Sequence, residues 1–110
     1  MANREDAALL VQLAQWGTNL GIQEAMRTVF ADEFGPETAT NQDDAVSRLL
    51  TFGETIATLT KNDLLDTALV LDWLWIAGLW AQVGPAALKA RAKLGVPQMH
   101  ENLEALAARQ

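Results

Sequence analysis

Residues 68–81 read Ala-Leu-Val-Leu-Asp-Trp-Leu-Trp-Ile-Ala-Gly-Leu-Trp-Ala, and this stretch decides the fold. It contains one charged residue, Asp72, and three of the four tryptophans of the chain. A helix over it would be apolar nearly all round, so it must be buried within its own chain or against another molecule. As a helix the run would extend only about 21 Å, whereas the hydrocarbon core of a bilayer is about 30 Å thick. The sequence therefore predicts a soluble protein with a tryptophan-rich helix at its centre.

This helix is expected over residues 62–83 and carries two apolar faces. One face holds Leu65, Leu69, Trp73, Ile76, Trp80 and Val83, and the other holds Leu64, Ala68, Leu71, Trp75 and Leu79. Such a helix either forms the central post of a bundle or lies between the core and a partner subunit, since large apolar patches rarely stay exposed. We expect the first face to fill the core. We expect Leu64, Leu71, Trp75 and Leu79 to form a homodimer interface or to line a pocket.

The rest of the chain is also helical in pattern, and no segment alternates with period two. Further helices are expected over residues 4–16, 19–33, 43–60, 85–94 and 97–109, with Gly and Pro residues at or near most of the boundaries. The sequence predicts one all-α domain over residues 1–110, a compact bundle of five or six helices around the tryptophan-rich helix. It is organised as a helix pair over residues 4–34, a linker over residues 35–42 and helices over residues 43–109.

Three details of the helices are informative. Gly17 ends or bends the first helix, and Gly53 interrupts the third at a cost of about 1 kcal/mol in helix propensity. Gly53 is either tolerated strain or a site where another backbone comes close. The short Gly95-Val96-Pro97 link folds the last two helices back on each other, which predicts a contact between Arg91 and Glu104.

Composition narrows the class of protein. The net charge is −6, which argues against a surface that binds phosphates or nucleic acid. The absence of cysteine excludes disulfides, thiolate metal sites and cysteine nucleophiles. The N-terminal residues lack the basic and apolar regions of a signal peptide. We therefore expect a cytoplasmic location and no membrane span.

No catalytic constellation, metal site or cofactor site is predicted. The single histidine, His100, lies in a polar stretch, and a lone helix-surface histidine is usually solvated. Asp72 is the candidate buried carboxylate, and desolvation would raise its pKa. It can equally pair with Arg48 or Arg91, or face solvent. The protein is therefore not expected to be an enzyme.

A family resemblance covers a little over half of the chain. It rests on Leu49-Leu50-Thr51-Phe52-Gly53-Glu54, Asn62-Asp63-Leu64-Leu65-Asp66, the Trp80 position, Arg91-Ala-Lys-Leu-Gly95-Val-Pro97 and Glu101-Asn102-Leu103-Glu104-Ala105-Leu106. Over residues 47–109 the chain resembles a family of small helical bacterial and phage proteins, a domain of unknown function. Members often carry an N-terminal membrane segment, which this sequence lacks. The resemblance implies a fold and no chemistry.

Two functions remain open at this point. The first is a non-enzymatic helical interaction or scaffold module that forms a homodimer and also offers a surface to an unidentified protein partner. The alternative is a small-molecule binding domain with an apolar pocket lined by tryptophans.

Overall fold

The computed structural model describes the whole chain, residues 1–110, as six helices without strands, with 70% of the residues in helices. The helices are α1 (Arg4–Leu20), α2 (Ile22–Val29), α3 (Asp44–Lys61), α4 (Thr67–Trp73), α5 (Ile76–Leu94) and α6 (Glu101–Ala108). All six contribute to one cluster of 21 buried apolar residues. The all-α bundle predicted from the sequence is confirmed.

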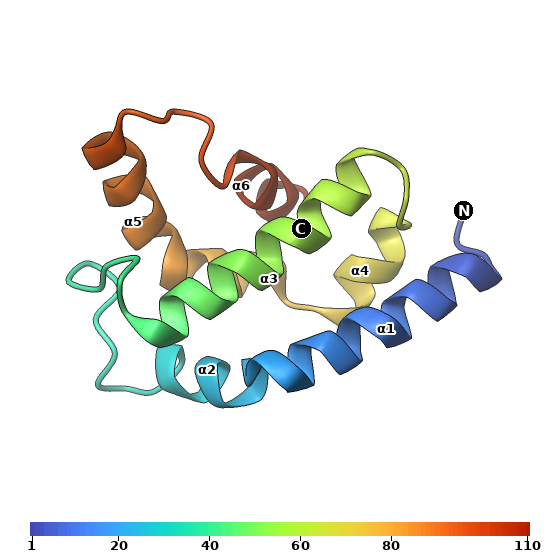
Figure 1. Cartoon of the computed structure of the whole chain (residues 1–110), viewed down its shortest axis with the longest axis horizontal. Helices are drawn as coiled ribbons and strands as arrows, with labels where there is room; N and C mark the ends of the chain where they lie inside the picture. Colours follow the sequence, from blue (N-terminus) through green and yellow to red (C-terminus); the bar gives the residue numbers. More distant parts are fainter.

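Helix α3 occupies the centre of the bundle. Figure 1 shows α1 and α2 following one another along one side of α3, with α5 and α6 on the other side. In agreement with this view, α3 packs against α1, α2, α5 and α6. Leu49, Phe52 and Ile56 on α3 are almost completely buried. The central post is therefore α3, and the tryptophan-rich segment is packed beside it.

The tryptophan-rich segment is two helices, so the single helix predicted over residues 62–83 is wrong. The chain is extended at Leu74, and the axes of α4 and α5 differ by 85°. The side chain of Gln110 satisfies the backbone at this break: its Nε2 donates to the carbonyls of Leu71 and Leu74, and its Oε1 accepts from the Ala77 N–H. These three bonds replace helix bonds that the bend removes.

Helix α5 continues through Gly84-Pro85, where the sequence predicted a boundary. Proline lacks an N–H, so the carbonyl of Ala81 loses its partner in the helix. Ala81 is exposed, and water can therefore bond that carbonyl. The Trp80 indole lies across Gly84, with ring atoms 2.8 Å from the position that a Cβ would take. Gly84 thus serves the packing of Trp80 and does not end the helix.

No single helix has both the length and the apolar character needed to cross a bilayer. Together α4 and α5 reach that length and composition, but only as the sharply bent pair described above.

Two other glycines mark close side-chain packing inside helices. Gly17 does not end α1, which continues to Leu20 and closes at Gly21 with φ 71°. A Cβ on Gly17 would lie 2.9 Å from the ring of Phe52. A Cβ on Gly53 would lie 2.9 Å from both methyl carbons of Leu103. The close approach considered for Gly53 is therefore made by a side chain of α6.

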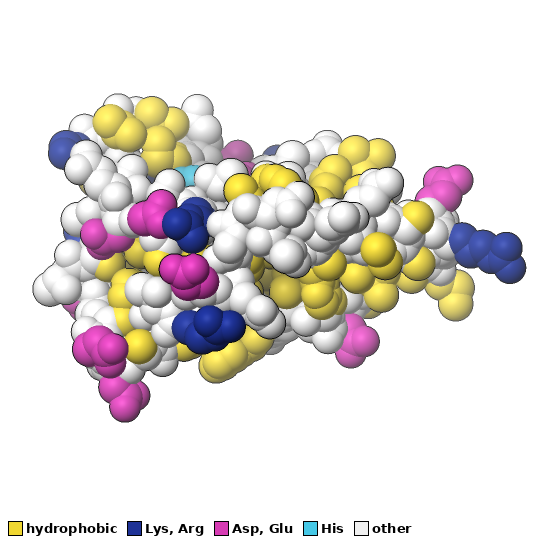
Figure 2. Space-filling view, turned by 60° about the horizontal axis from the view of Figure 1, so that its bottom comes forward, with side chains coloured by type: hydrophobic (Ala, Val, Ile, Leu, Met, Phe, Trp, Pro, Cys, Tyr) yellow, Lys and Arg dark blue, Asp and Glu magenta, His cyan; other side chains and the backbone are white.

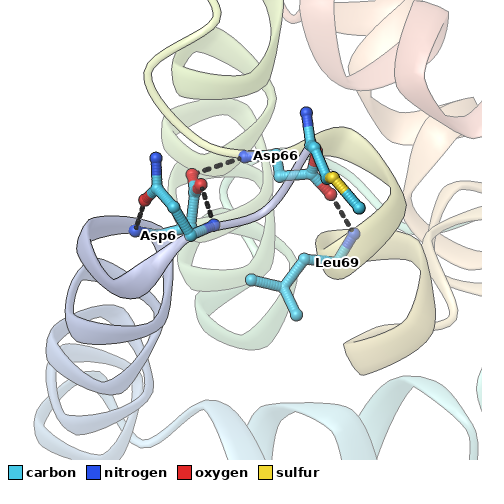
Figure 3. Close-up of polar contacts among 5 residues, drawn as sticks. Asp6, Asp66 and Leu69 are labelled. Atoms are coloured by element: carbon cyan, nitrogen blue, oxygen red, sulfur yellow. Dashed lines mark hydrogen bonds and ion pairs between the residues drawn. The ribbon is translucent and has the colours of Figure 1, made fainter.

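The N-terminus of α1 is tied to the N-terminus of α4 through two aspartates (Figure 3). Asn3 and Asp6 form a capping box, in which each side chain accepts the backbone N–H of the other residue at 2.9 Å. The second carboxylate oxygen of buried Asp6 accepts the Asp66 N–H at 2.9 Å, and Asp66 in turn accepts the Leu69 N–H. One carboxylate therefore caps its own helix and positions the cap of another.

The segment between α2 and α3 is not a free linker. Ala39 is buried and belongs to the core cluster. The ammonium of Lys89 donates to the carbonyl of Glu37 at 2.9 Å. The segment is thereby held against α5.

Candidate interaction surface

The four residues predicted to share an interface do not share a face. Leu79 is 3% exposed and belongs to the core, and Leu71 is half-buried against that core. Leu64 is 63% exposed, but it lies in the loop between α3 and α4, beside the N-terminus of α1. Trp75 is 70% exposed and lies at the start of α5. The break at Leu74 separates these positions, and of the four only Leu64 and Trp75 are exposed.

Trp75 forms an exposed stacked pair with Phe30, which follows α2. The ring centroids are 5.9 Å apart and the ring planes differ by 13°. Phe30 is 42% exposed. The indole also lies directly over Gly78, where any Cβ would overlap the ring at 2.3 Å. This support holds a large aromatic surface in a fixed position at the surface of the molecule.

A hollow of about 500 Å³ adjoins this pair. Its lining residues are Phe30, Ala31, Asp32, Phe34, Pro36, Trp75, Ala77, Gly78, Ala81 and Gln82. Most are apolar, and the only charged side chain among them is Asp32. The hollow is therefore an apolar depression with an acidic edge.

The outer side of α5 continues the apolar surface away from the hollow. Ala77, Ala81, Pro85, Leu88 and Ala92 follow one another at intervals of four, four, three and four residues, which places them on one face. Ala81, Leu88 and Ala92 are exposed, and Ala77 and Pro85 are half-buried. We call these five residues together with Phe30 and Trp75 the α5 surface. Sequence reasoning missed it because the expected boundary at Gly84 divided the pattern between two helices.

Asp72 is exposed, so the interpretation as a buried carboxylate is wrong. The short α4 turns its outer side to solvent once the chain breaks at Leu74. Neither candidate partner reaches Asp72, because Arg48 pairs with Asp44 and Arg91 pairs with Glu104. Asp72 accordingly makes no ion pair within the chain.

The predicted contact between Arg91 and Glu104 is confirmed, with Arg91 Nη1 3.1 Å from Glu104 Oε1. Arg91 also donates to the Met99 carbonyl through Nε and Nη2, at 3.1 and 2.7 Å. From α3, Glu54 accepts the Leu103 N–H at 2.9 Å in the first turn of α6. The negative carboxylate at this helix N-terminus complements the helix dipole. Together these contacts fix α6 on α3 and α5.

His100 lies at this junction and is half-buried, not freely solvated as predicted. It precedes α6 in a left-handed conformation with φ 59°, and its buried Nδ1 has no hydrogen-bond partner. Burial lowers the pKa of His100 below its ordinary value of 6.5; nearby Glu54 opposes this shift and Arg91 adds to it. No group of three or more histidine, aspartate or glutamate side chains could hold a metal ion. The geometry therefore assigns His100 a role in the packing of α6.

Acidification is expected to destabilise the fold through His100. Because the pKa is lower in the folded state, the unfolded chain binds more protons between that value and 6.5. The free energy of unfolding should therefore fall as the pH decreases through the ordinary pKa of 6.5. His100→Asn removes the titrating group and suits the left-handed backbone, so it should flatten this dependence in urea titrations. An equally steep dependence in the variant would contradict the assignment to His100.

A second hollow, also of about 500 Å³ and lined by both apolar and polar residues, lies between α1, α2 and α4. Its lining includes Gly17, Ile22, Phe52, Trp73 and Leu74, with Glu24 and Arg27 at its polar side. Trp73 meets Phe52 edge to face, with ring centroids 6.2 Å apart. Figure 2 shows the side of the molecule on which α1 and α2 lie, with apolar side chains over its middle and charged ones toward its ends.

Among known proteins, the chain is similar to one family. No curated protein and no solved structure matches the chain significantly. A family model described as a domain of unknown function, DUF4760, matches residues 2–110. The family resemblance drawn from residues 47–109 is thereby confirmed as one to a domain of unknown function, and it extends over the N-terminal helices as well. The chain belongs to the DUF4760 family.

Proposed function

We propose that this protein is a non-enzymatic interaction module that self-associates through the α5 surface. The observation that carries the proposal is Trp75, a tryptophan 70% exposed at one end of a continuous apolar helix face. Exposed aromatic side chains in fixed positions are the usual anchors of protein interfaces. Burial of the Trp75 and Phe30 rings in a complex would remove the largest exposed aromatic area of the chain from water.

A second copy of the chain is the simplest partner. Closed two-fold pairing is the commonest oligomeric state, because one patch then meets its own copy. The proposal includes a cytoplasmic setting. The chain has no cysteine and no single helix that could cross a bilayer, and both observations are compatible with that setting.

Sedimentation equilibrium of the wild type at micromolar concentrations tests the proposal. We expect a mass that rises with concentration toward twice the 12.0 kDa of one chain. The emission of Trp75 should shift to shorter wavelength over the same range, since the indole leaves water on association. A mass of one chain at all concentrations would contradict self-association.

The second candidate function is small-molecule binding in the hollow beside Trp73. Its volume lies within the range of about 300–1,000 Å³ that is usual for ligand pockets, and two aromatic rings line it. Anilinonaphthalene sulfonate is a suitable probe because it joins apolar rings to an anion that Arg27 could pair with. Saturable binding that is lost in Trp73→Ala but retained in Trp75→Ala would favour this function.

A further inference from the structure

We propose that the α5 surface holds a second copy of this chain with the two α5 helices antiparallel and the two-fold axis passing close to Pro85. This inference rests on the proposed self-association and adds the geometry of the partner.

The spacing of the apolar residues on α5 suits an antiparallel copy. The midpoint between Ala77 and Ala92 falls at residues 84–85, so an antiparallel copy centred there repeats the pattern in reverse. Ala77 then faces the partner's Ala92, and Ala81 faces the partner's Leu88. Leu88 thus meets a small side chain of the partner, which lets the two helix backbones approach closely near the axis.

Charge is distributed unevenly along one flank of α5. Gln82 donates to the Val29 carbonyl at 2.6 Å and Lys89 to the Glu37 carbonyl at 2.9 Å. The segment over residues 29–37 therefore follows a single flank of the helix. Asp32 lines the hollow at the N-terminal end of this flank. Lys93 lies one turn beyond Lys89, at the C-terminal end of the same flank.

A two-fold axis that relates two antiparallel α5 helices places each flank of the helix beside the same flank of the partner. The N-terminal end of the flank in one copy then lies opposite the C-terminal end of the flank in the other. Asp32 then lies opposite the partner's Lys93, and Lys93 lies opposite the partner's Asp32. Two complementary ion pairs thus frame the apolar centre of the interface. A parallel pairing would place the two ends differently and would form neither pair.

Introduced cysteines test this geometry directly, because the chain has none of its own. Pro85→Cys should give a covalent dimer under mild oxidation, since its copy lies across the axis within disulfide reach. Ala77→Cys should not link to itself, because the two copies would be about 23 Å apart along the helices. A mixture of Ala77→Cys with Ala92→Cys should link efficiently. Val11→Cys, exposed on α1, is the matched control and should stay uncoupled.

A charge exchange provides a second test that needs no cysteine. Asp32→Lys and Lys93→Asp should each raise the dissociation constant about 2- to 5-fold, and the double variant should restore it. Circular dichroism of every variant checks that the helices remain. If the double variant instead weakens association by the sum of the two single effects, that result would contradict the ion pairs.

The outcomes separate the two proposals. A wild type that remains monomeric overturns the self-association itself. A wild-type dimer in which Val11→Cys links while Pro85→Cys does not overturns the antiparallel α5 geometry and leaves self-association standing. Linking of Ala77→Cys to itself shows a parallel arrangement and also overturns the inference.

Discussion

Replacement of Phe52 by alanine is expected to lower the free energy of unfolding by about 3–5 kcal/mol. The Phe52 ring is 2% exposed and joins two tryptophans: its centroid is 5.5 Å from that of Trp16 and 6.2 Å from that of Trp73. Each such aromatic pair contributes about 0.5–1.5 kcal/mol beyond the area it buries. Gly17 packs directly against the Phe52 ring, so loss of the ring would leave a cavity between α1 and α3. Urea denaturation of both proteins measures the effect.

Phe30→Ala is the matched control, since it removes the same side chain from an exposed position. It should cost less than about 1 kcal/mol when measured at concentrations too low for association. If Phe52→Ala were no more destabilising than Phe30→Ala, the central place of Phe52 in the core would be wrong.

The fold class could be predicted because each helix carries its own local signal. The spacing of Leu49, Phe52 and Ile56 marks the buried face of α3 without any knowledge of its neighbours. The Arg91–Glu104 contact was also predictable, since a three-residue link leaves two helices few ways to fold back on each other. Predictions of this kind depend on residues close together in the sequence.

The break between α4 and α5 could not be predicted in this way. Neither glycine nor proline stands at Leu74 or Trp75, and the apolar pattern continues across them. The bonds that satisfy the bend come from Gln110, more than 30 residues later. In contrast, Gly84-Pro85 has the local signature of a helix boundary and lies within α5. The displaced boundary is also why the four residues predicted to form one interface do not share a face.

Long-range caps were missed for the same reason. Asp6 lies in the first turn of α1, where an acidic side chain complements the dipole of its own helix, yet it also accepts the N–H of Asp66, 60 residues away. Glu54 on α3 caps α6 by accepting the N–H of Leu103, 49 residues away. A carboxylate satisfies any N–H within reach, and sequence distance does not reveal which one that is.

Trp75→Ala is expected to weaken self-association by about 2 kcal/mol or more, which corresponds to a rise of roughly 30-fold in the dissociation constant. Within its own chain the exposed indole only stacks on Phe30 and covers Gly78, so the free energy of unfolding of the monomer should fall by only about 1 kcal/mol. Trp73→Ala is the matched control, because it removes the same indole from a half-buried position against Phe52.

Trp73→Ala should show the opposite pattern, with a large effect on stability and a small effect on self-association. Trp73→Ala should lower the free energy of unfolding by about 2 kcal/mol or more while the dissociation constant of the folded protein stays near that of the wild type. Sedimentation measures association in both variants, and urea denaturation at low concentration measures stability. Because each variant loses the same side chain, a difference between them reports where the indole lies. A Trp75→Ala dimer as tight as that of the wild type would show that the copies meet on another surface.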